Sequence, residues 1–237
     1  MLDIVVPVYN EAENILRLFD EIQREIKAEK RVLIVYDFDG DTTVPVVREY
    51  APRYPFEIQL VLNALGRGAL NAIKTGMAAS TNDMVLVMMA DSSDRLDVVD
   101  SMCALMEQGY DVVCGSRYMK GGKQNGGPIL KGLFSRMAGL SLHFLTRIPT
   151  HDVTNSFKLY RKSMLEKIRI ESTGGFEIGL EICVKAYTEG YRIGEVPSEW
   201  FDREEGESNF HLWKWLPHYL HWYLYCIRRT WFGKKAV

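Results

Sequence analysis

Carboxylate and amide side chains follow three apolar runs of the chain, each at the point where the apolar pattern stops. These runs begin the segments 2–11, 31–41 and 85–94. Ligands of open α/β sheets bind outside the carboxyl ends of the strands, so we expect the polar groups at the three ends to share one crevice. The sequence therefore predicts a site for a cation, or for a ligand that brings one. The side chains concerned are Asn10, Glu11, Asp37, Asp39, Asp41, Asp91 and Asp94.

Asp91 is the strongest candidate for a metal ligand, with Ser93 and Asp94 just behind it. Carboxylates repel a diphosphate unless a divalent cation lies between them, and Mg²⁺ or Mn²⁺ is the natural ion for oxygen ligands. The alternative is that Asp91 only caps the helix that follows it. Both interpretations stay open on this segment alone.

Two further segments have the composition of a nucleotide and phosphate site. Asp37, Asp39 and Asp41 could accept hydrogen bonds from a base and a ribose, or they could form an Asx turn at Gly40. The run GRGALN, with Arg67 and Gly68, opens a predicted helix and could offer backbone N–H groups and a guanidinium to a phosphate. It lacks the third glycine of the dinucleotide fingerprint, which disfavours a nicotinamide-binding oxidoreductase.

Basic residues in the second half of the chain suit a second phosphate. Arg117 ends a predicted strand. Lys131, Ser135 and Arg136 follow at helical spacing, and together they favour an anion site. The alternative for these three is a solvated helix face. Arg203 begins the charged run REEGES, which could fold over a bound diphosphate or lie at the surface.

Alternating strand and helix patterns must position these groups. The alternation predicts an α/β fold of the doubly wound type, with a mainly parallel sheet and helices on both faces. We expect Asn10 as the N-cap of the first helix, a flexible loop over 119–127, a polar connector over 149–157, and a last strand pair or edge within 192–201. Predicted strands begin the segments 2–11 and 31–41, and further strands are predicted over 58–63, 84–90 and 111–116. Predicted helices cover 11–26, 44–50, 68–79, 96–108, 131–145 and 177–189.

The composition is that of a globular protein with reduced cysteines. Apolar residues make up 47% of the chain and charged residues 25%, which excludes a disordered chain. The cysteines show no C-x-x-C spacing for zinc, so we expect packed thiols and a cytoplasmic location. No apolar run reaches the roughly 18 residues that a spanning helix needs. The first strand pattern begins too close to Met1 to leave room for a signal peptide.

Residues 210–237 differ from the rest of the chain in composition. They hold four of the five tryptophans and several bases but no Asp or Glu, although the whole chain has a net charge of −2. Aromatic and basic residues together suit the headgroup zone of a membrane. We therefore expect one domain over 1–209 and an amphipathic tail over 210–237 at a membrane surface. The alternative is that the tail packs back on the body or makes a homo-oligomer contact.

The order of these motifs resembles the inverting GT-A glycosyltransferases of glycosyltransferase family 2. Along the chain come PVYNE, the Asp cluster after the second strand, GRGA, the Ala-Asp pair after the fourth strand, and GSRY followed by Gly-Gly. The later runs HDVTNSFKLYR, GYRIGEVP and REEGES are similar to the branch typified by dolichol-phosphate mannose synthase. The resemblance covers the chain up to about residue 208 and implies a Rossmann-like GT-A fold.

The resemblance also implies roles for single residues. Asp91 matches the second carboxylate of the family's Asp-x-Asp metal motif, and Arg203 matches a loop arginine that closes on the donor diphosphate. With Arg117 they are the expected catalytic residues. Together with the interpretations above, we expect a nucleotide-sugar site at Pro7, Tyr9, Glu11, Asp37, Asp39, Arg67, Gly68, Ala90 and Asp91, an acceptor-phosphate site at Arg117, Lys131, Ser135 and Arg136, and a metal site at Asp91 and Asp94.

The chain departs from the family's pattern near the metal site. Met89 replaces the first carboxylate of Asp-x-Asp, and Ser93 stands where a further metal ligand is often found. The usual Asp-Asp-Gly-Ser run reads Tyr-Asp-Phe-Asp at 36–39. Asp94 or Asp39 could compensate for the missing carboxylate.

The resemblance implies transfer of a hexosyl group from a nucleoside-diphosphate sugar, GDP-mannose or a UDP-sugar, to a polyprenyl phosphate with inversion. A phosphate monoester is largely dianionic at neutral pH, so this acceptor needs no general base. The implied cofactor is Mg²⁺ or Mn²⁺. The implied location is peripheral, at the cytoplasmic face of a membrane.

Two alternatives stay open for the function. Met89 favours a non-catalytic nucleotide-sugar binder, which would bind its ligand without turnover and without metal dependence. A glycosyltransferase with a soluble hydroxyl acceptor would need a general base, for which His151 and Asp152 of the connector are the local candidates. Nucleic-acid binding is disfavoured because the chain outside 210–237 is acidic.

Overall fold

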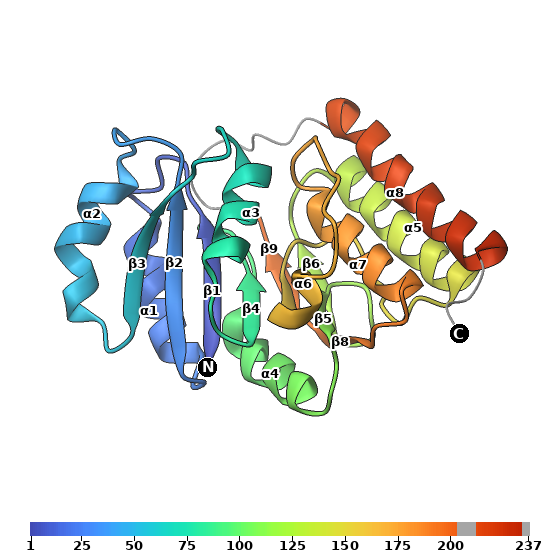
Figure 1. Cartoon of the computed structure of the whole chain (residues 1–237), viewed down its shortest axis with the longest axis horizontal. Helices are drawn as coiled ribbons and strands as arrows, with labels where there is room; N and C mark the ends of the chain where they lie inside the picture. Colours follow the sequence, from blue (N-terminus) through green and yellow to red (C-terminus); the bar gives the residue numbers. More distant parts are fainter. Residues whose placement is uncertain (203–211, 234–237) are drawn as a thin grey trace.

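The computed structural model describes residues 1–202 and 212–233 and shows an α/β fold around a seven-stranded sheet (Figure 1). The strand order is β3-β2-β1-β4-β7-β5-β8, and every neighbouring pair is parallel except the two that involve β7. The predicted fold class is therefore confirmed. The strands are β1 (Leu2–Pro7), β2 (Lys30–Tyr36), β3 (Glu57–Leu62), β4 (Met84–Val87), β5 (Val112–Ser116), β7 (Lys158–Arg161) and β8 (Ile193–Pro197).

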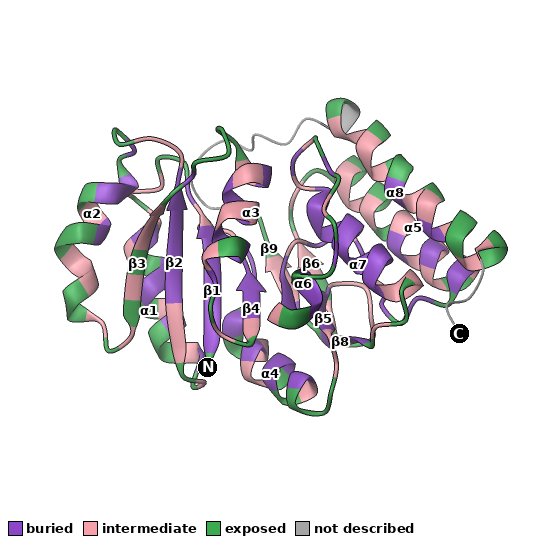
Figure 2. Cartoon of the chain, viewed as in Figure 1, coloured by how far each residue is buried: buried purple, intermediate pink, exposed green. Residues whose placement is uncertain are grey.

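Helices cover both faces of the sheet, and the central strands are buried between them (Figure 2). In β1, Ile4 and Val6 pack with α1, α2 and α4, while Val5 packs with α3 on the other face. The continuous apolar runs of the strands follow from burial on both sides. The helices are α1 (Ile15–Glu25), α2 (Thr43–Tyr50), η1 (Ala51–Arg53), α3 (Ala69–Ala79), η2 (Leu96–Val98), α4 (Val99–Glu107), α5 (Ile129–Thr146), α6 (Lys162–Leu165), α7 (Ile178–Thr188) and α8 (Leu212–Phe232).

The strand β7 is absent from the sequence prediction. It lies between β4 and β5 and runs antiparallel to both. It is four residues long, and its first residue, Lys158, is fully buried. So short a run with a buried charge shows no strand periodicity. Because β7 is antiparallel, the connector over 149–157 that precedes it lies at the carboxyl ends of β4 and β5.

The loop predicted over 119–127 is partly structured. It contains β6 (Lys123–Asn125), which pairs in parallel with β9 (Glu199–Phe201) to form a small second sheet. A further bridge joins Trp200 of β9 to Asp94 in the turn after β4. The expectation of a flexible loop is therefore wrong for its middle part, because β9 holds it against the acidic turn.

The predicted N-cap at Asn10 is also wrong. The helix α1 begins after Asn14, whose side chain makes no capping hydrogen bond. Asn10 adopts a positive φ of 57°, a conformation that asparagine tolerates better than most residues. Its Oδ1 accepts a hydrogen bond from Thr42 N at 3.1 Å. The residues after β1 therefore form a tight turn and not the start of a helix.

The C-terminal helix α8 packs against α5 and α7 (Figure 1). Trp222 and Cys226 on its inner side are buried. The Trp222 indole donates to Ser172 Oγ at 3.0 Å, and Lys185 Nζ of α7 lies 4.7 Å from the ring centroid. The aromatic segment thus packs on the body of the protein, as one of the two interpretations of its sequence expects.

Other side chains of α5 and α8 are large, apolar and exposed to solvent. In the part of the chain that the structure describes, no helix is long and apolar enough to cross a membrane. A role of the tail at a membrane surface stays a prediction. The exposed side chains are Ile129, Leu130, Leu133, Phe134, Met137 and Phe144 of α5 and Leu220, Leu224, Trp231 and Phe232 of α8.

We predict that Trp222→Ala loosens α8 from the body. The change removes a buried ring, its hydrogen bond to Ser172 and its contact with Lys185, and core changes of this size cost about 3–5 kcal/mol. Urea unfolding should show a loss of that order. Phe232→Ala, at a position that is 82% exposed, is the control and should cost about 1 kcal/mol or less. Equal midpoints for the two variants would contradict the packing role.

Candidate active site

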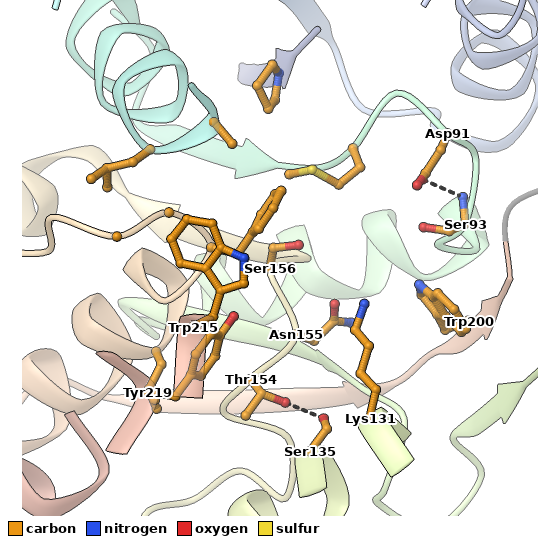
Figure 3. Close-up of a pocket in the computed structure, with 18 of the residues that line it drawn as sticks. Asp91, Ser93, Lys131, Ser135, Thr154, Asn155, Ser156, Trp200, Trp215 and Tyr219 are labelled. Atoms are coloured by element: carbon orange, nitrogen blue, oxygen red, sulfur yellow. Dashed lines mark hydrogen bonds between the residues drawn. The ribbon is translucent and has the colours of Figure 1, made fainter. Parts of the chain in front are cut away.

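One cavity of 1020 Å³ opens at the carboxyl ends of the strands (Figure 3). Its wall comes from the turns after β1, β2, β4 and β5, from α3, α5 and α8, and from the connector before β7. Residues predicted from distant parts of the sequence therefore meet. The predicted residues in this wall are Pro7, Tyr9, Glu11, Asp37, Arg67, Gly68, Ala90, Asp91, Asp94, Arg117, Lys131 and Ser135.

Two predicted residues are not in this wall. Asp39 and Arg136 have exposed side chains and do not line the cavity as the described residues form it. Arg203 lies outside the described residues. Helical geometry explains why Arg136 is not in the wall. Lys131 and Ser135 are four residues apart and share one face of α5, whereas Arg136 points to another face.

Asp37 shapes the nucleotide end of the cavity as well as lining it. Its Oδ1 accepts a hydrogen bond from Asn63 Nδ2 at 2.7 Å, and its Oδ2 accepts one from Gly68 N at 2.8 Å. Gly68 has a φ of 116°, which favours glycine. The Arg67 guanidinium lies 4.8 Å from the centroid of the Phe38 ring. The N–H of Gly68, one of the backbone groups expected to bind a phosphate, thus donates to Asp37 instead. This bond fixes the loop that carries Arg67.

A second set of hydrogen bonds, which the sequence analysis did not predict, holds the turn after β1. Asp41 is 1% exposed, and its Oδ2 accepts a bond from Asn10 N at 3.1 Å. Thr43 Oγ1 accepts a bond from Glu11 N at 2.9 Å. These bonds position Tyr9 and Glu11 in the cavity wall. In the turn after β2, Asp41 is therefore buried beneath the turn after β1, whereas Asp39 is exposed.

Asp91 lies in the turn after β4, and its side chain lines the cavity (Figure 3). Its Oδ1 accepts a hydrogen bond from Ser93 N at 3.2 Å across Ser92, which has a φ of 53°. The helices that follow have Arg95 and Val98 at their N-caps, and neither has a side-chain capping bond. The interpretation of Asp91 as a helix cap is therefore wrong.

Asp94 is a buried acid beside Asp91. Burial raises the pKa of Asp94 to about 7, the hydrogen bond from Asn155 Nδ2 at 3.3 Å opposes this shift, and the charge of Asp91 adds to it. The carboxyl group therefore changes its charge near neutral pH.

Asp91 and Asp94 are the carboxylates that could hold a divalent cation here. Within residues 1–202 and 212–233, no three His, Cys, Asp or Glu side chains come together as a metal-binding group. Mg²⁺ in proteins commonly uses one or two carboxylates and completes its shell with substrate phosphates and water. The donor set fits a cation that arrives with a diphosphate and does not fit a closed protein site.

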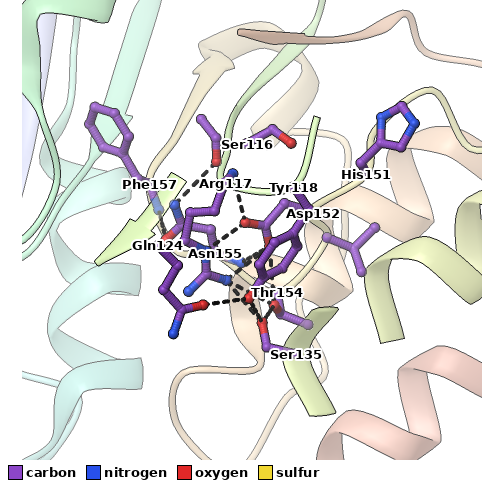
Figure 4. Close-up of polar contacts among 12 residues, drawn as sticks. Ser116, Arg117, Tyr118, Gln124, Ser135, His151, Asp152, Thr154, Asn155 and Phe157 are labelled. Carbon is purple, nitrogen blue, oxygen red and sulfur yellow. Dashed lines mark hydrogen bonds and ion pairs between the residues drawn. The ribbon is translucent and has the colours of Figure 1, made fainter. Parts of the chain in front are cut away.

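Arg117 and Asp152 form a buried ion pair at the end of β5 (Figure 4). The Arg117 Nε and Nη2 atoms lie 2.6 Å and 3.0 Å from the two carboxylate oxygens, and the side chains are 11% and 0% exposed. Burial would raise the pKa of Asp152, but the Arg117 charge outweighs it and the pKa is lowered. The same pairing raises the pKa of Arg117 against the effect of burial. Both groups therefore stay charged inside the protein.

The ion pair continues into a network of hydroxyl groups. Arg117 Nη2 donates to Ser135 Oγ at 3.0 Å and to Thr154 Oγ1 at 3.2 Å, and the two hydroxyls are 2.5 Å apart. Tyr118 OH donates to Ser135 Oγ at 2.9 Å. Lys131, one turn before Ser135 on α5, adds a second positive charge to the wall. The arrangement offers hydroxyl and cationic groups to an anion.

Lys158 holds the connector that carries part of this network. Its Nζ donates to the carbonyl of Val153 at 3.1 Å and to that of Asn155. The sequence marks this connector by a run of short polar residues between a helix and a strand. Such a run is also typical of ordinary turns, so it does not by itself indicate a site. The connector residues whose place at the site the sequence analysis missed are Asp152 as the partner of Arg117, and Thr154, Asn155 and Ser156 as parts of the wall.

His151, the general base of one alternative, does not line the cavity in the described part of the chain. Its Nδ1 lies 2.5 Å from Glu195 Oε1, and its ring stacks on that of His143 with centroids 4.1 Å apart. Asp152 is engaged by Arg117. No histidine occurs among the described residues of the wall. This geometry disfavours base-assisted attack by a hydroxyl acceptor.

An α/β sheet with an acidic turn, a glycine loop and a cationic pocket at its strand ends offers groups that suit a phosphate-bearing ligand. The chain belongs to glycosyl transferase family 2, whose family model, described as "Glycosyl transferase family 2", matches residues 3–169. The matched range contains the turns after β1, β2, β4 and β5 and the connector, and it ends before α7 and α8. The predicted family is confirmed.

Two curated relatives cover most of this chain. A dolichol-phosphate mannosyltransferase of Pyrococcus furiosus is 29% identical over 212 residues, which are 87% of this chain and 58% of that protein. A polyprenol monophosphomannose synthase of Mycolicibacterium smegmatis is 27% identical over 210 residues, 86% of this chain and 79% of that protein. The chain thus spans less than two thirds of the first relative.

Solved structures with the same fold include glucosyl-3-phosphoglycerate synthase from Mycobacterium tuberculosis. Its complex with phosphoglyceric acid has a TM-score of 0.70 at 13% identity and covers 96% of this chain and 80% of that one. Its complex with Mn²⁺, UDP and glucosyl-3-phosphoglycerate has a TM-score of 0.68 at 13% identity, covering 97% and 80%. At this identity the likeness shows the fold, and it confirms the predicted GT-A architecture.

We predict that the buried carboxyl of Asp94 makes stability fall as the pH rises. Its folded pKa of about 7 exceeds the unfolded value of 3.8, so from about pH 4 to 7 the folded state holds a proton that the unfolded state releases. The loss should reach about 2–4 kcal/mol by pH 8. Asp94→Asn keeps an acceptor for Asn155 without the charge and should lack this loss. Urea unfolding at pH 5 and pH 8 checks it, and parallel pH profiles for the two proteins would refute it.

Proposed function

We propose that this protein transfers a hexosyl group from a nucleoside-diphosphate sugar, GDP-mannose or a UDP-sugar, to the phosphate of a polyprenyl lipid with inversion at the anomeric carbon. One observation carries the proposal. A single cavity joins a polar end, with Asp37, Arg67 and Asp91, to an apolar groove between α5 and α8. A nucleotide and a lipid suit the two ends, and their reacting groups would meet between them.

The relatives support this choice of substrates. One is named for mannosyl transfer to dolichol phosphate and the other for synthesis of a polyprenol monophosphomannose. Mannose carried by GDP is therefore the first donor to test.

The apolar groove supports a lipid acceptor. Three residues of its wall, Phe134, Met137 and Leu220, are also exposed at the surface by 37%, 58% and 49%. The groove therefore opens sideways onto the exposed apolar surface of α5 and α8. A polyprenyl chain in such a groove gains about 25 cal/mol for each Å² of apolar surface that it buries, whereas a soluble sugar acceptor gains little there.

The cationic wall supports a phosphate as the nucleophile. Lys131 offers positive charge, and Arg117, paired with Asp152, donates through Nη2 to the hydroxyls of Ser135 on α5 and Thr154 on the connector. A dianionic phosphate attacks without losing a proton, which agrees with a wall that has no histidine among its described residues. These groups would orient the phosphate and screen its repulsion from the donor diphosphate.

Asp91, with Asp94 beside it, would hold Mg²⁺ or Mn²⁺ next to the donor diphosphate. A bound cation of this kind supplies Lewis-acid stabilisation of charge on a leaving diphosphate. Arg203, expected to close over the same group, belongs to the segment outside the described residues. Asp37, Tyr9 and Glu11 would position the base and the ribose.

A non-catalytic nucleotide-sugar binder is the second candidate. The observation that favours it is Met89, which lines the cavity at the position where the family usually carries a metal-binding carboxylate. Such a protein would keep the donor end of the cavity and lack metal-dependent turnover.

The exposed apolar side chains of α5 and α8, together with the exposed bases Arg136, Lys214, Arg228 and Arg229, suit an anionic membrane surface. We infer a peripheral protein at the cytoplasmic face. A catalytic domain over 1–209 would be held there by the tail over 210–237 and by α5.

We predict that Asp91→Asn lowers sugar transfer by about 100-fold or more, since it removes the carboxylate that faces the diphosphate. The assay offers GDP-mannose, UDP-glucose and UDP-N-acetylglucosamine in turn with a short polyprenyl phosphate, with Mn²⁺ or with EDTA. Asp97→Asn is the control, because this carboxylate is half exposed and pairs with Arg95 at the surface.

The same assay separates the two candidate functions. Metal-dependent transfer from one donor, lost in the Asp91 variant, is the expected result. Binding of a donor without turnover to any acceptor would instead favour the non-catalytic binder. Full activity of Asp91→Asn would remove this residue from the site.

We predict that vesicles containing about one third phosphatidylserine sediment the protein and that Phe144→Glu with Phe232→Glu weakens this binding about tenfold. These rings are 72% and 82% exposed, and the change replaces apolar contact by repulsion from anionic lipid. Leu62→Glu, on β3 and 49% exposed, is the matched control and should bind like the wild type. Equal sedimentation of all three proteins would exclude this surface as the membrane contact.

A further inference from the structure

Lys158 is a buried cation that the proposed reaction does not contact. It is the first residue of β7, in the middle of the sheet, and is 0% exposed. Lysine is almost never fully buried unless a counter-charge pairs with it. No carboxylate among the described residues lies within ion-pair distance of its Nζ, which donates to the carbonyls of Val153 and Asn155.

The charges near Lys158 leave an excess of positive charge inside the protein. Arg117 and Asp152 neutralise each other as an ion pair, and both Arg117 and Lys158 lower the pKa of Asp152. Asp94, a further buried acid, accepts a hydrogen bond from Asn155 Nδ2 at 3.3 Å and forms no ion pair with Lys158 within the described residues. An unpaired interior charge costs several kcal/mol, and an anion bound close by would offset that cost.

The buried carboxylates of α7 and its N-cap are held by other groups. Glu181 Oε1 lies 2.7 Å from Lys185 Nζ. Glu177, at the N-cap, accepts hydrogen bonds from Gly174 N and Gly175 N at 2.8 Å and 2.6 Å. These two carboxylates therefore do not pair with Lys158.

The position of Lys158 places it behind the proposed acceptor site. The connector turns two of its carbonyls toward Nζ, while the side chains of Thr154, Asn155 and Ser156 line the cavity (Figure 3). The first turn of α7 packs next to the ammonium, since a Cβ on Gly179 would lie in van der Waals contact with Nζ at 3.7 Å. The backbone of the connector thus separates the positive charge of Lys158 from the cavity.

We propose that Lys158 is a positioning residue for the acceptor phosphate. It fixes the connector from behind, and it supplies the interior positive charge that favours a dianionic head group over a monoanionic one. The inference rests on the proposed function and adds to it the charge state by which the acceptor is selected. Lys158 itself touches no substrate.

The test compares two soluble acceptor analogues, a short polyprenyl phosphate monoester and its methyl phosphodiester, which differ by one negative charge at pH 8. Their dissociation constants are measured by calorimetry for the wild type, Lys158→Gln and Lys158→Met. The wild type should prefer the monoester, and both variants should lose about tenfold of that preference, as expected for one charge at this range. Glutamine keeps a donor for the carbonyls, so it separates the charge from the clamp.

Lys185→Met is the matched control. This lysine is also buried, but Glu171 and Glu181 pair with it, so its loss should lower stability and leave the monoester preference unchanged. A purely structural role of Lys158 would weaken both analogues equally, and that result would overturn the proposal. The proposal would also be overturned if the wild type showed no preference for the monoester. This measurement remains valid even if a variant fails to fold. Absence of any transfer from sugar nucleotide to the monoester would instead overturn the proposed function.

Discussion

The ion pair between Arg117 and Asp152 is the constraint on which the geometry of the site depends. Its charges are out of water, so the cost of removing them from solvent is offset only while both groups keep all their hydrogen bonds. Those bonds reach Ser135 on α5 and Thr154 on the connector. Three segments that are distant in sequence therefore hold one another in place, and the cavity wall combines positive charge with rigidity. A site that must bring two anions together needs both.

Much of the sheet could be predicted because strands buried on both faces alternate with amphipathic helices, and both patterns are visible in the sequence. β7 could not be predicted in this way. Its four residues begin with Lys158, and a strand there is possible only because the connector folds back and gives the ammonium two carbonyl partners. β6 and β9 have three residues each and pair with each other, so their formation depends on a contact between segments 76 residues apart.

The candidate site follows the same division. Residues at the ends of parallel strands could be predicted as one cluster, because the topology forces those ends to one edge of the sheet. The connector could not be predicted by this reasoning. It leads into the amino-terminal end of β7, and because β7 is antiparallel to its neighbours, that end lies at the same edge of the sheet. Single residues were decided by local geometry. Asp41 is buried and Asp39 is exposed, and Ser135 faces the cavity while Arg136 faces solvent.

The helix α8 shows why composition alone left two interpretations of the tail. Trp222 and Cys226 pack on the body, Leu220 lines the cavity, and Phe232 is exposed, so one aromatic helix serves three environments. The two interpretations are therefore compatible. Because the groove between α5 and α8 opens onto the exposed apolar surface, a lipid chain could enter the cavity from that surface without crossing water. Lipid access and nucleotide access would then use different sides of the molecule, and only the reacting phosphate would have to pass the cationic wall.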